Sequence, residues 1–536
     1  MRIKRPKTLF AAALTAYLTV GALAGCSLSS AAEETTATVA SGTSTTQVAL
    51  TTDDALADAK DYTELAELAD ETWDEADEVA VTLDGDTAEA SGDGVDVDGS
   101  TVTITAPGTY RLSGTLTDGQ VVVSSEADGL VRLVLDGVDV TSSTTAAIAV
   151  MDADDVSVVL ADGSENSLTD AAEYQDDGDE DGPNAALFST ADMVISGGGT
   201  LDVTGNSNDG ITSKDGLVVA GGTIRVDAAD DGVRGKDFLV VTGGTLDVTA
   251  ADDGLKADNE DGTDDDGDTV GYAAFLGGDV TVSAGDDGVH AEADLVVADG
   301  TLTVTESVEG LEGAHILIAG GTTDVTASDD GLNASGATTT DDTATTGDGE
   351  RPDGPPEGGP GGGMGGMGGG PGGEGAGDFS LAITGGTLTV DADGDGLDSN
   401  GTLTITGGDT TVHGPTMNGN GALDSNGGIA VSGGNLIAVG SSGMAETPDA
   451  DSSQAWVAAT FDTLPAGTEL QVIGDGGAVL GDITLTKDTQ SIVLSVADVV
   501  DGQTYTIVAD GKEVATATAG EAIAGGMGGM GGGRQG

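Results

Sequence analysis

The sequence predicts an all-β fold, a right-handed parallel β-helix, and three observations support this prediction. A pattern of about 22 residues repeats through the middle of the chain. Each repeat contains short runs in which apolar and polar residues alternate, bounded by glycine-rich turns. Aromatic residues make up only 3% of the sequence, as suits a thin core built from Val, Ala, Leu and Ile. Self-similarity at a fixed period of this length is typical of solenoid proteins.

The repeat is marked by an acidic residue, a glycine and an aliphatic residue in succession. The acidic residue of this element falls at Asp209, Asp231, Asp253, Asp287, Glu309, Asp330 and Asp395. The spacings are 22, 22, 34, 22, 21 and 65 residues, and the two long gaps hold insertions at 258–269 and 336–378. A Gly-Gly-Thr element or a close variant follows the same period, for example at Gly221 and Gly243.

Each repeat has the composition expected for one turn of a coil. Its three alternating runs predict three short strands, each with one face buried. At about 3.3 Å per residue, such a repeat traces a three-sided coil roughly 70 Å round. Stacked coils would place equivalent residues about 4.8 Å apart and bury one continuous aliphatic core.

The N-terminal residues predict export and a lipid anchor. Residues 1–26 combine a basic start, a short apolar run and the sequence Leu-Ala-Gly-Cys ending at Cys26, which resembles a bacterial lipobox. Cys26 is therefore expected to be lipidated, on the outer face of a bacterial cell membrane. The alternative is an ordinary signal peptide followed by a chance cysteine.

Composition divides the rest of the chain into four parts. Residues 27–72 are rich in Ser, Thr, Ala and acid and predict a disordered tether. Residues 73–445 predict the β-helix, and 446–520 a β-rich C-terminal cap or module with longer strands. Residues 521–536, rich in Gly and Met, predict a flexible tail.

The net charge limits the partners of this protein. The sequence has 94 Asp and Glu against 16 Lys and Arg, which gives a formal charge of −78. Binding nucleic acid requires clustered Lys and Arg, so nucleic acid is excluded as a partner. The single Cys excludes a disulfide framework. We expect a monomer.

Stacking would turn the repeated acids into columns of carboxylates that repel one another by roughly 1 kcal/mol per pair in water. Because the chain has so few cations, we expect metal ions to supply part of the counter-charge, and oxygen ligands suit Ca²⁺. The candidate ligands are the acids of the Asp-Gly elements and the acids that precede them: Asp209, Asp230, Asp231, Asp252, Asp253, Asp286, Asp287, Glu309, Asp329 and Asp330. The alternative is turn chemistry alone, in which each Asp caps its own backbone and each Gly adopts a positive φ.

A second set of outward positions lies three residues after each acid. Consecutive repeats place Arg234, Lys256 and His290 there, followed by Glu312 and Asn333. These residues predict a groove for an acidic polymer whose carboxylates would meet Lys and Arg directly and the protein acids through Ca²⁺. Charge pairing with the neighbouring Asp residues is the alternative.

The region from Trp73 to about residue 445 resembles the bacterial extracellular carbohydrate-binding-domain family of pectate-lyase-like β-helices. The stretches that carry the resemblance are Thr103–Gly114, Val131–Thr141, Ala161–Asp170, the Asp-Asp-Gly repeats, Val308–Gly313 and Gly440–Ala445. The resemblance implies a calcium-containing β-helix that binds polysaccharide, particularly acidic sugars such as polygalacturonate. It favours the repeat acids as metal or ligand contacts. The long Gly/Met insertion and the high acidity depart from the family pattern.

The leading hypothesis is a surface-anchored lipoprotein that binds acidic polysaccharide with Ca²⁺. One alternative is a Ca²⁺-dependent polysaccharide lyase, in which Arg234 or Lys256 would supply the base. The other is a structural adhesin or calcium-binding surface protein without a specific glycan. No catalytic residue is assigned.

Overall fold

The computed structural model describes residues 49–69, 72–174, 182–336 and 376–523. Within these ranges the all-β prediction is confirmed, because strands form nearly all of the regular structure and one sheet joins 35 of them, mostly in parallel. The helical segments are α1 (Thr52–Ala55), α2 (Thr63–Glu67) and two short 3-10 turns at Glu75–Asp77 and Asp475–Gly477. The predictions for 1–26, for most of the 336–378 insertion and for 524–536 lie outside the described residues.

Across the described ranges, no helix has the length and apolar character needed to cross a membrane.

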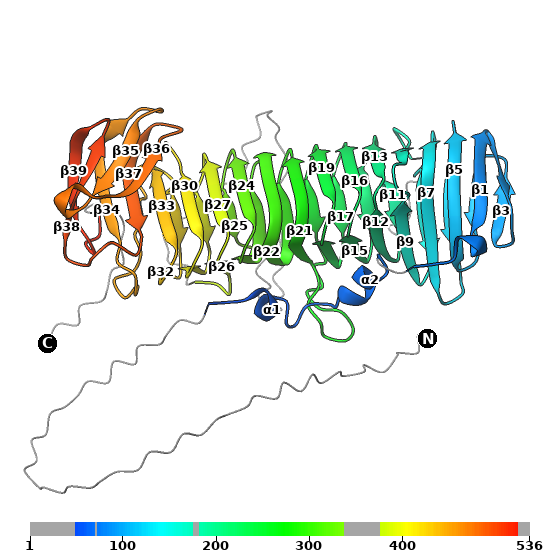
Figure 1. Ribbon diagram of the computed structural model, residues 1–536, viewed down its shortest axis with the longest axis horizontal. Helices are drawn as coiled ribbons and strands as arrows, with labels where there is room; N and C mark the ends of the chain where they lie inside the picture. The colour runs from blue at the N-terminus through cyan, green and yellow to red at the C-terminus, as the bar shows by residue number, and fades with distance from the viewer. Residues whose placement is uncertain (1–48, 70–71, 175–181, 337–375, 524–536) are drawn as a thin grey trace, which may run out of the picture. The chain divides into compact units, whose positions relative to one another are not determined.

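The central strands form three ladders, and each repeat adds one strand to each ladder (Figure 1). Long strands turn corners between ladders, so that β22 (Val289–Glu306) contributes to all three. We call one repeat a coil. Equivalent residues of adjacent coils are paired in parallel, as the 22-residue period predicts.

Each ladder is named after one feature: the carboxylate ladder after the acids of the Asp-Gly elements, and the threonine ladder after the threonines of the Gly-Gly-Thr turns. The strap ladder is named after residues 49–69, the strap, which pack on its outer face. The carboxylate ladder runs through β11 (Ala185–Ser189), β14 (Asp209–Ser213), β17 (Val233–Gly235), β20 (Leu255–Ala257), β22, β23 (Leu311–Ile318), β25 (Leu332–Ala334), β28 (Leu397–Ser399) and β31 (Leu423–Ser425). The threonine ladder runs through β10 (Glu165–Thr169), β13 (Thr200–Gly205), β16 (Thr223–Ala228), β19 (Thr245–Ala250), β21 (Tyr272–Ser283), β22, β24 (Thr322–Ala327), β27 (Thr387–Ala392), β30 (Asp409–His413) and β33 (Asn435–Gly440). The strap ladder runs through β9 (Asp155–Leu160), β12 (Asp192–Gly197), β15 (Gly216–Val219), β18 (Phe238–Val241), β21, β22, β23, β26 (Ser380–Ile383), β29 (Thr402–Ile405) and β32 (Ile429–Val431).

The first strands form less regular coils. They are β1 (Val79–Gly85), β2 (Thr87–Ala90), β3 (Val95–Asp98), β4 (Thr101–Ile104), β5 (Gly108–Leu116), β6 (Gln120–Ser124), β7 (Leu130–Thr141) and β8 (Ile148–Asp152). Two antiparallel hairpins, β1–β2 and β3–β4, stand among otherwise parallel pairings.

The C-terminal strands leave the ladder pattern in the segment for which the sequence predicts a β-rich module. They are β34 (Val457–Leu464), β35 (Glu469–Ile473), β36 (Val479–Thr484), β37 (Thr489–Ser495), β38 (Thr504–Ala509) and β39 (Lys512–Thr518). Strand β37 pairs antiparallel with β33, and four of the others form a separate sheet.

Aliphatic side chains fill the space between the three ladders. In the carboxylate ladder the residue after each Asp-Gly is fully or almost fully buried, and its equivalents stack in register: Val233, Leu255, Val289, Leu311, Leu332, Leu397 and Leu423. Burying one such side chain contributes roughly 1.5–3 kcal/mol. This column gives every coil the same core and holds the coils in register.

The glycine of the Asp-Gly element is needed for close packing, and the expectation of a positive φ there is wrong. A methyl group on Gly232 would lie 2.2 Å from Val248 Cγ1 and 2.5 Å from the carbonyl oxygen of Gly254 in the next coil. The positive φ angles occur instead at the second glycine of the Gly-Gly-Thr turns, such as Gly244 with φ of 88°.

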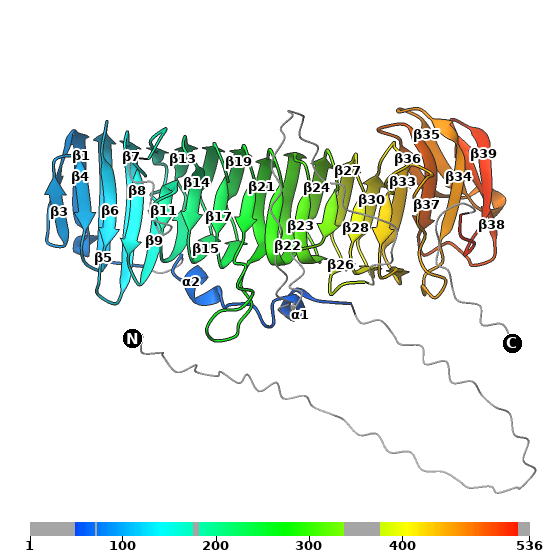
Figure 2. The same ribbon diagram turned by 180° about the vertical axis from the view of Figure 1, so that it is seen from behind.

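The predicted tether of residues 27–72 is wrong for residues 49–69, which we call the strap. The strap packs on the outer face of the strap ladder, where α1 contacts β22 and α2 contacts β12 (Figures 1 and 2). That face is unusually apolar, with one buried side chain per coil: Val194, Val218, Val240, Ala274, Val296, Leu317 and Ala382. Composition alone predicts disorder because it cannot show that a matching apolar face exists elsewhere in the chain.

Replacing Gly232 with Ala should destabilise the protein, because neither the next coil's backbone nor Val248 has room for a methyl group. Overpacking of this kind costs roughly 1–3 kcal/mol. Chemical denaturation should show this loss. Gly419→Ala is the matched control, because a methyl group there meets no heavy atom within 4 Å. Equal stabilities of the two variants would contradict the steric role.

Candidate functional site

The acids of the Asp-Gly elements follow the carboxylate ladder, and four of them, Asp209, Asp231, Asp253 and Asp287, are almost entirely enclosed, whereas the later ones are half-buried. Asp209 is 1% exposed and Asp287 is 7% exposed. The carboxylate of Asp253 accepts a hydrogen bond of 3.0 Å from the backbone N–H of Asp287, its equivalent in the next coil. Asp231 accepts one of 3.3 Å from Asp253 in the same way. Each of these acids therefore caps the coil that follows, rather than its own backbone.

The acids that precede them, among them Asp230, Asp252, Asp286 and Asp329, are more open to solvent. Repeating a buried carboxylate in every coil raises its proton affinity. Burial, aided by the charge of Asp209, raises the pKa of Asp231 to about 7.

The second set of predicted positions lies in register along the carboxylate ladder. Arg234 pairs with Lys256, Lys256 with His290, His290 with Glu312, and Glu312 with Asn333. The structure thus brings together the cations that the sequence places at equivalent positions.

These cations are paired with carboxylates of the protein itself. Arg234 donates two hydrogen bonds, of 2.8 and 2.6 Å, to Asp258 at the start of the 258–269 insertion. Lys256 Nζ lies 3.2 Å from Asp231 and 2.7 Å from Asp253. Burial opposes the charge of Lys256, but the hydrogen bonds and charges of Asp253 and Asp231 outweigh it and raise the lysine pKa. The geometry favours internal charge pairing over a free cationic strip.

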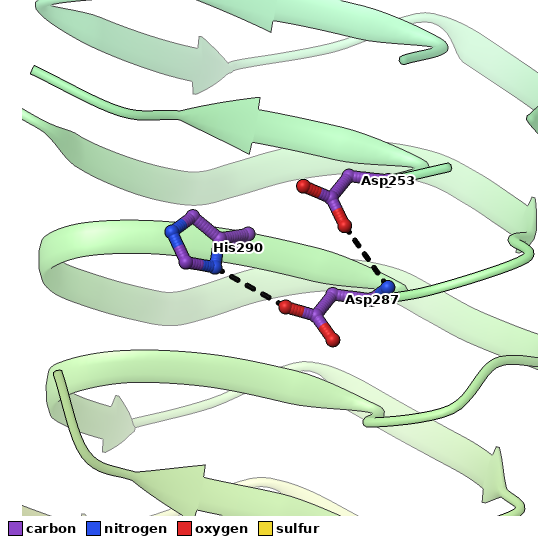
Figure 3. Close-up of side chains that lie close together, drawn as sticks. All are labelled: Asp253, Asp287 and His290. Atoms are coloured by element: carbon purple, nitrogen blue, oxygen red, sulfur yellow. Dashed lines mark hydrogen bonds and ion pairs between the residues drawn. The ribbon is translucent and has the colours of Figure 1, made fainter. Parts of the chain in front are cut away.

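The Nδ1 atom of His290 faces Asp287 of its own coil (Figure 3) and also contacts Glu312 of the next coil. His290 Nδ1 is 3.2 Å from Asp287 and 2.9 Å from Glu312. Burial opposes its charge, but these two hydrogen bonds outweigh burial and raise the pKa of His290 to about 10. The imidazole is therefore cationic at neutral pH, and a metal ion could bind to it only by displacing its proton.

Three groups of acidic or imidazole side chains have ligand atoms within 4.8 Å of one another, so that each could hold a metal ion. They are Asp230, Asp231 and Asp252; Asp253, Asp287 and His290; and Asp287, Glu309 and Glu312. The first and third groups offer only oxygen, the donor set that Ca²⁺ prefers. Burial raises the pKa of Glu309 to about 7, as expected for a crowded carboxylate that lacks a counter-ion. The oxygen-only groups therefore have a donor set that suits a calcium ion, which would share Asp231 with Lys256 or Glu312 with His290.

The candidate ligands chosen from the sequence do not include a cluster of acids in the last coils, which joins Asp395 of the last Asp-Gly element to Asp398, Asp424 and Glu446. Burial raises the pKa of Asp395 and Glu446 to about 7, and burial together with the charge of Asp424 raises that of Asp398 to about 8. Asn333 precedes Asp398 in register, and its buried amide oxygen has no hydrogen-bond partner. A repeated Leu-Asp-Ser-Asn motif at 397–400 and 423–426 was the available signal.

The sequence interpretation also missed Lys60 of the strap, which forms ion pairs with Asp215 and Asp237. The signal was its isolation, because Lys60 is the only Lys or Arg between Lys7 and Arg111. Cys26 lies outside the described residues.

Part of the chain is similar to proteins that are described as containing a carbohydrate-binding domain. Residues 98–353 match a family model described as carbohydrate-binding domain-containing protein. A curated relative from Acetivibrio thermocellus with the same description is 41% identical over 150 residues, or 28% of this chain. The match spans 52% of that relative, about half of its length. The chain is also similar to a solved structure, a gadolinium derivative of the polysaccharide lyase-like protein from C. thermocellum. That similarity has 33% identity and a TM-score of 0.41, and it covers 46% of this chain and 94% of that one.

The acids of the last coils should make stability fall as pH rises. The pKa values of Asp395, Asp398 and Glu446 are near 7–8 in the folded state but about 4 in the unfolded state, so between these limits the folded state binds more protons. This stabilisation is complete below pH 4 and is lost as pH rises through about 8. In chelator, thermal unfolding should therefore occur several degrees higher at pH 5 than at pH 8.5.

Asp398→Asn should raise the free energy of unfolding at pH 8.5 by about 1 kcal/mol or more, and by less at pH 5. Asp247→Asn, at an exposed position of the threonine ladder, is the control and should change little. A stability that rises from pH 5 to pH 8.5 in chelator would contradict this account.

Replacing Lys256 with Ala should destabilise the protein by about 1–3 kcal/mol, because Asp231 and Asp253 would stay enclosed without their cation. Arg225→Ala is the control, since Arg225 pairs with Asp202 on the open surface, where such pairs contribute about 0–1 kcal/mol. Calorimetry should also show that Ca²⁺ raises the melting temperature of the Lys256 variant more than that of the parent. An unchanged melting temperature for Lys256→Ala would mean that the lysine is free to serve a ligand.

Proposed function

We propose that this protein is an extracellular, lipid-anchored binding protein for polysaccharide, with acidic sugars as its preferred ligands and Ca²⁺ as the bridging ion. One observation carries the proposal. The carbohydrate-binding family match at 98–353 spans the coils in which the three candidate metal groups occur.

The architecture that we propose is a right-handed parallel β-helix. The three ladders of parallel strands support it, since each strand is joined to its parallel neighbour in the next coil by a connection that crosses the other two ladders. Crossover connections between parallel strands are right-handed in about 98% of proteins. A crystal structure with traced coils would test the handedness directly.

Calcium is proposed at the oxygen-only groups. Asp230, Asp231 and Asp252 converge from two adjacent coils, and Asp231 has a raised pKa that a divalent cation would lower. Such a site leaves coordination positions for water or for a carboxylate of the ligand, because Ca²⁺ takes 6–8 oxygen atoms.

This arrangement of carboxylates and calcium favours acidic sugars as the ligand. A uronate carboxylate approaching the ladder would meet protein carboxylates and would be repelled unless a cation lay between them. Because Arg234 and Lys256 already pair with Asp258, Asp231 and Asp253, a bridging Ca²⁺ is better placed than these side chains to receive it. The carboxylate ladder is thus proposed to bind the polysaccharide through calcium ions more than through Arg234 and Lys256.

The lyase alternative needs a general base, which must accept a proton. Arg234 makes two hydrogen bonds to Asp258, and the raised pKa of Lys256 keeps its ammonium charged at neutral pH. Neither side chain suits that role in this arrangement, so we propose binding rather than cleavage.

The proposal is tested by retention on immobilised polygalacturonate. The full chain should be retained in millimolar Ca²⁺ and elute with chelator, with at least a tenfold loss of affinity. The double variant Asp230→Asn/Asp252→Asn should lose calcium-dependent retention. Asp247→Asn/Asp279→Asn, which removes the same charge from exposed positions of the threonine ladder, should not.

Three outcomes would revise the proposal. Retention unaffected by chelator would contradict the calcium bridge, and absence of retention would contradict the acidic ligand. An ultraviolet signal from unsaturated products on incubation with polygalacturonate would indicate a lyase.

A further inference from the structure

The strap packs on the outer face of the strap ladder, which we call its seat. Few side chains of the strap are buried there. Helix α1 has no buried residue, and α2 has one, Leu65. Helices of four and five residues have no stability of their own in water. An open pocket of about 630 Å³ lies between α2 and the turns of the strap ladder, and buried Ser196, whose hydroxyl has no partner, is among its lining residues. The strap therefore holds to the coils mainly through half-buried side chains and leaves part of the surface beside α2 uncovered.

One lysine provides the most specific contact. Lys60 forms ion pairs with Asp215 and Asp237, which belong to consecutive coils, and its ammonium lies 5.7 Å from the centre of the Phe238 ring. A third acid, Asp192, acts on Lys60 through its charge. The seat therefore combines several carboxylates and an aromatic face around the position of one ammonium group.

Backbone contacts fix the extended part of the strap beside this lysine. The backbone N–H of Lys60 donates to the carbonyl of Thr269 over 2.8 Å, and Thr269 donates to Asp58 over 2.7 Å. The hydroxyl of Tyr272 donates to the carbonyl of Lys60 over 2.6 Å. The seat therefore recognises an extended peptide that carries a lysine.

We infer that this seat is an exchangeable peptide-binding surface, and that the strap of a second copy of this chain is the partner that fits it. The residues of the seat lie between Asp192 and Ala382, far along the chain from the strap, so a strap from another copy could make the same contacts. Two copies that exchange an identical segment can form a dimer without any new kind of contact, so the exchange has a small free-energy cost. The protein's own strap is favoured at low concentration, because its link to the first coil keeps it near the seat.

The lysine makes the exchange selective. Without an ammonium group, Asp192, Asp215 and Asp237 would remain as neighbouring charges beside an uncovered apolar face. A partner segment must therefore supply a cation together with small apolar side chains. Lys60, Ala55, Leu56 and Ala59 of the strap meet this requirement.

The experiment uses two preparations of the full chain with different affinity tags. They are mixed at high concentration in chelator, incubated below the melting temperature and recovered through one tag. The second tag should be recovered in an amount that grows with time and concentration. A synthetic peptide of residues 49–69 should reduce this recovery at least fivefold, whereas the same peptide with Lys60→Met should not.

Matched variants identify the contact. Lys60→Met in both preparations should abolish recovery of the second tag, while Lys512→Met, which removes an exposed cation in β39, should not. Melting temperatures of both variants establish that the chain remains folded. Absence of the second tag at every concentration would overturn the inference, as would recovery that Lys60→Met leaves unchanged. Since the assay contains no glycan or calcium, its outcome is independent of the proposed binding function.

Discussion

The register between coils is the constraint on which the rest of this structure depends. Each coil places its residues directly beside their equivalents in the next coil, about 4.8 Å away. The aliphatic column from Val233 to Leu423 shows the advantage, because one sequence pattern builds a continuous core. The same register also has an unfavourable effect on stability, because the one acid of each repeat becomes part of a column of carboxylates that repel one another. The functional chemistry of the molecule follows from how that column is neutralised.

Neutralisation changes along the stack. Several acids of the Asp-Gly elements accept a hydrogen bond from a backbone N–H group of the following coil, as Asp253 does from Asp287. The most deeply buried acid, Asp209, instead accepts from the side chains of Asn184 and Thr212. Through the middle coils, Arg234, Lys256 and His290 add positive charge from within the ladder. In the last described coils Asp398 and Asp424 stand in register with no cation at the equivalent positions, and burial raises their pKa values. Raised carboxylate pKa values thus occur along the ladder, as at Asp231 and Glu309, but among the described coils only the middle ones also hold protein cations at these positions.

The sequence predicts the coils well because the repeated residues that are visible in the sequence are the same residues that stack and bury the core. It predicts that Arg234, Lys256 and His290 occupy equivalent positions, because register converts spacing into proximity. It does not predict their partners: Asp258 reaches Arg234 from an insertion, which has no counterpart in other repeats. It also fails for the strap and Lys60, whose contacts lie 155 and 177 residues away and depend on the shape of an outer face. Periodic contacts can be read from one sequence, but contacts between a periodic and a non-periodic segment cannot.

The strap also determines how a mechanical load would enter the molecule. Its first described residues lie beside β22, in the middle of the stack, rather than at the end where the first strands form. A pull on the N-terminal side of residue 49 would therefore act first on α1, then on Lys60, then on α2, detaching these contacts one after another. Only after the strap had been peeled away would tension reach the first coil at β1. The contacts of the strap would therefore bear the load before the hydrogen bonds between the coils.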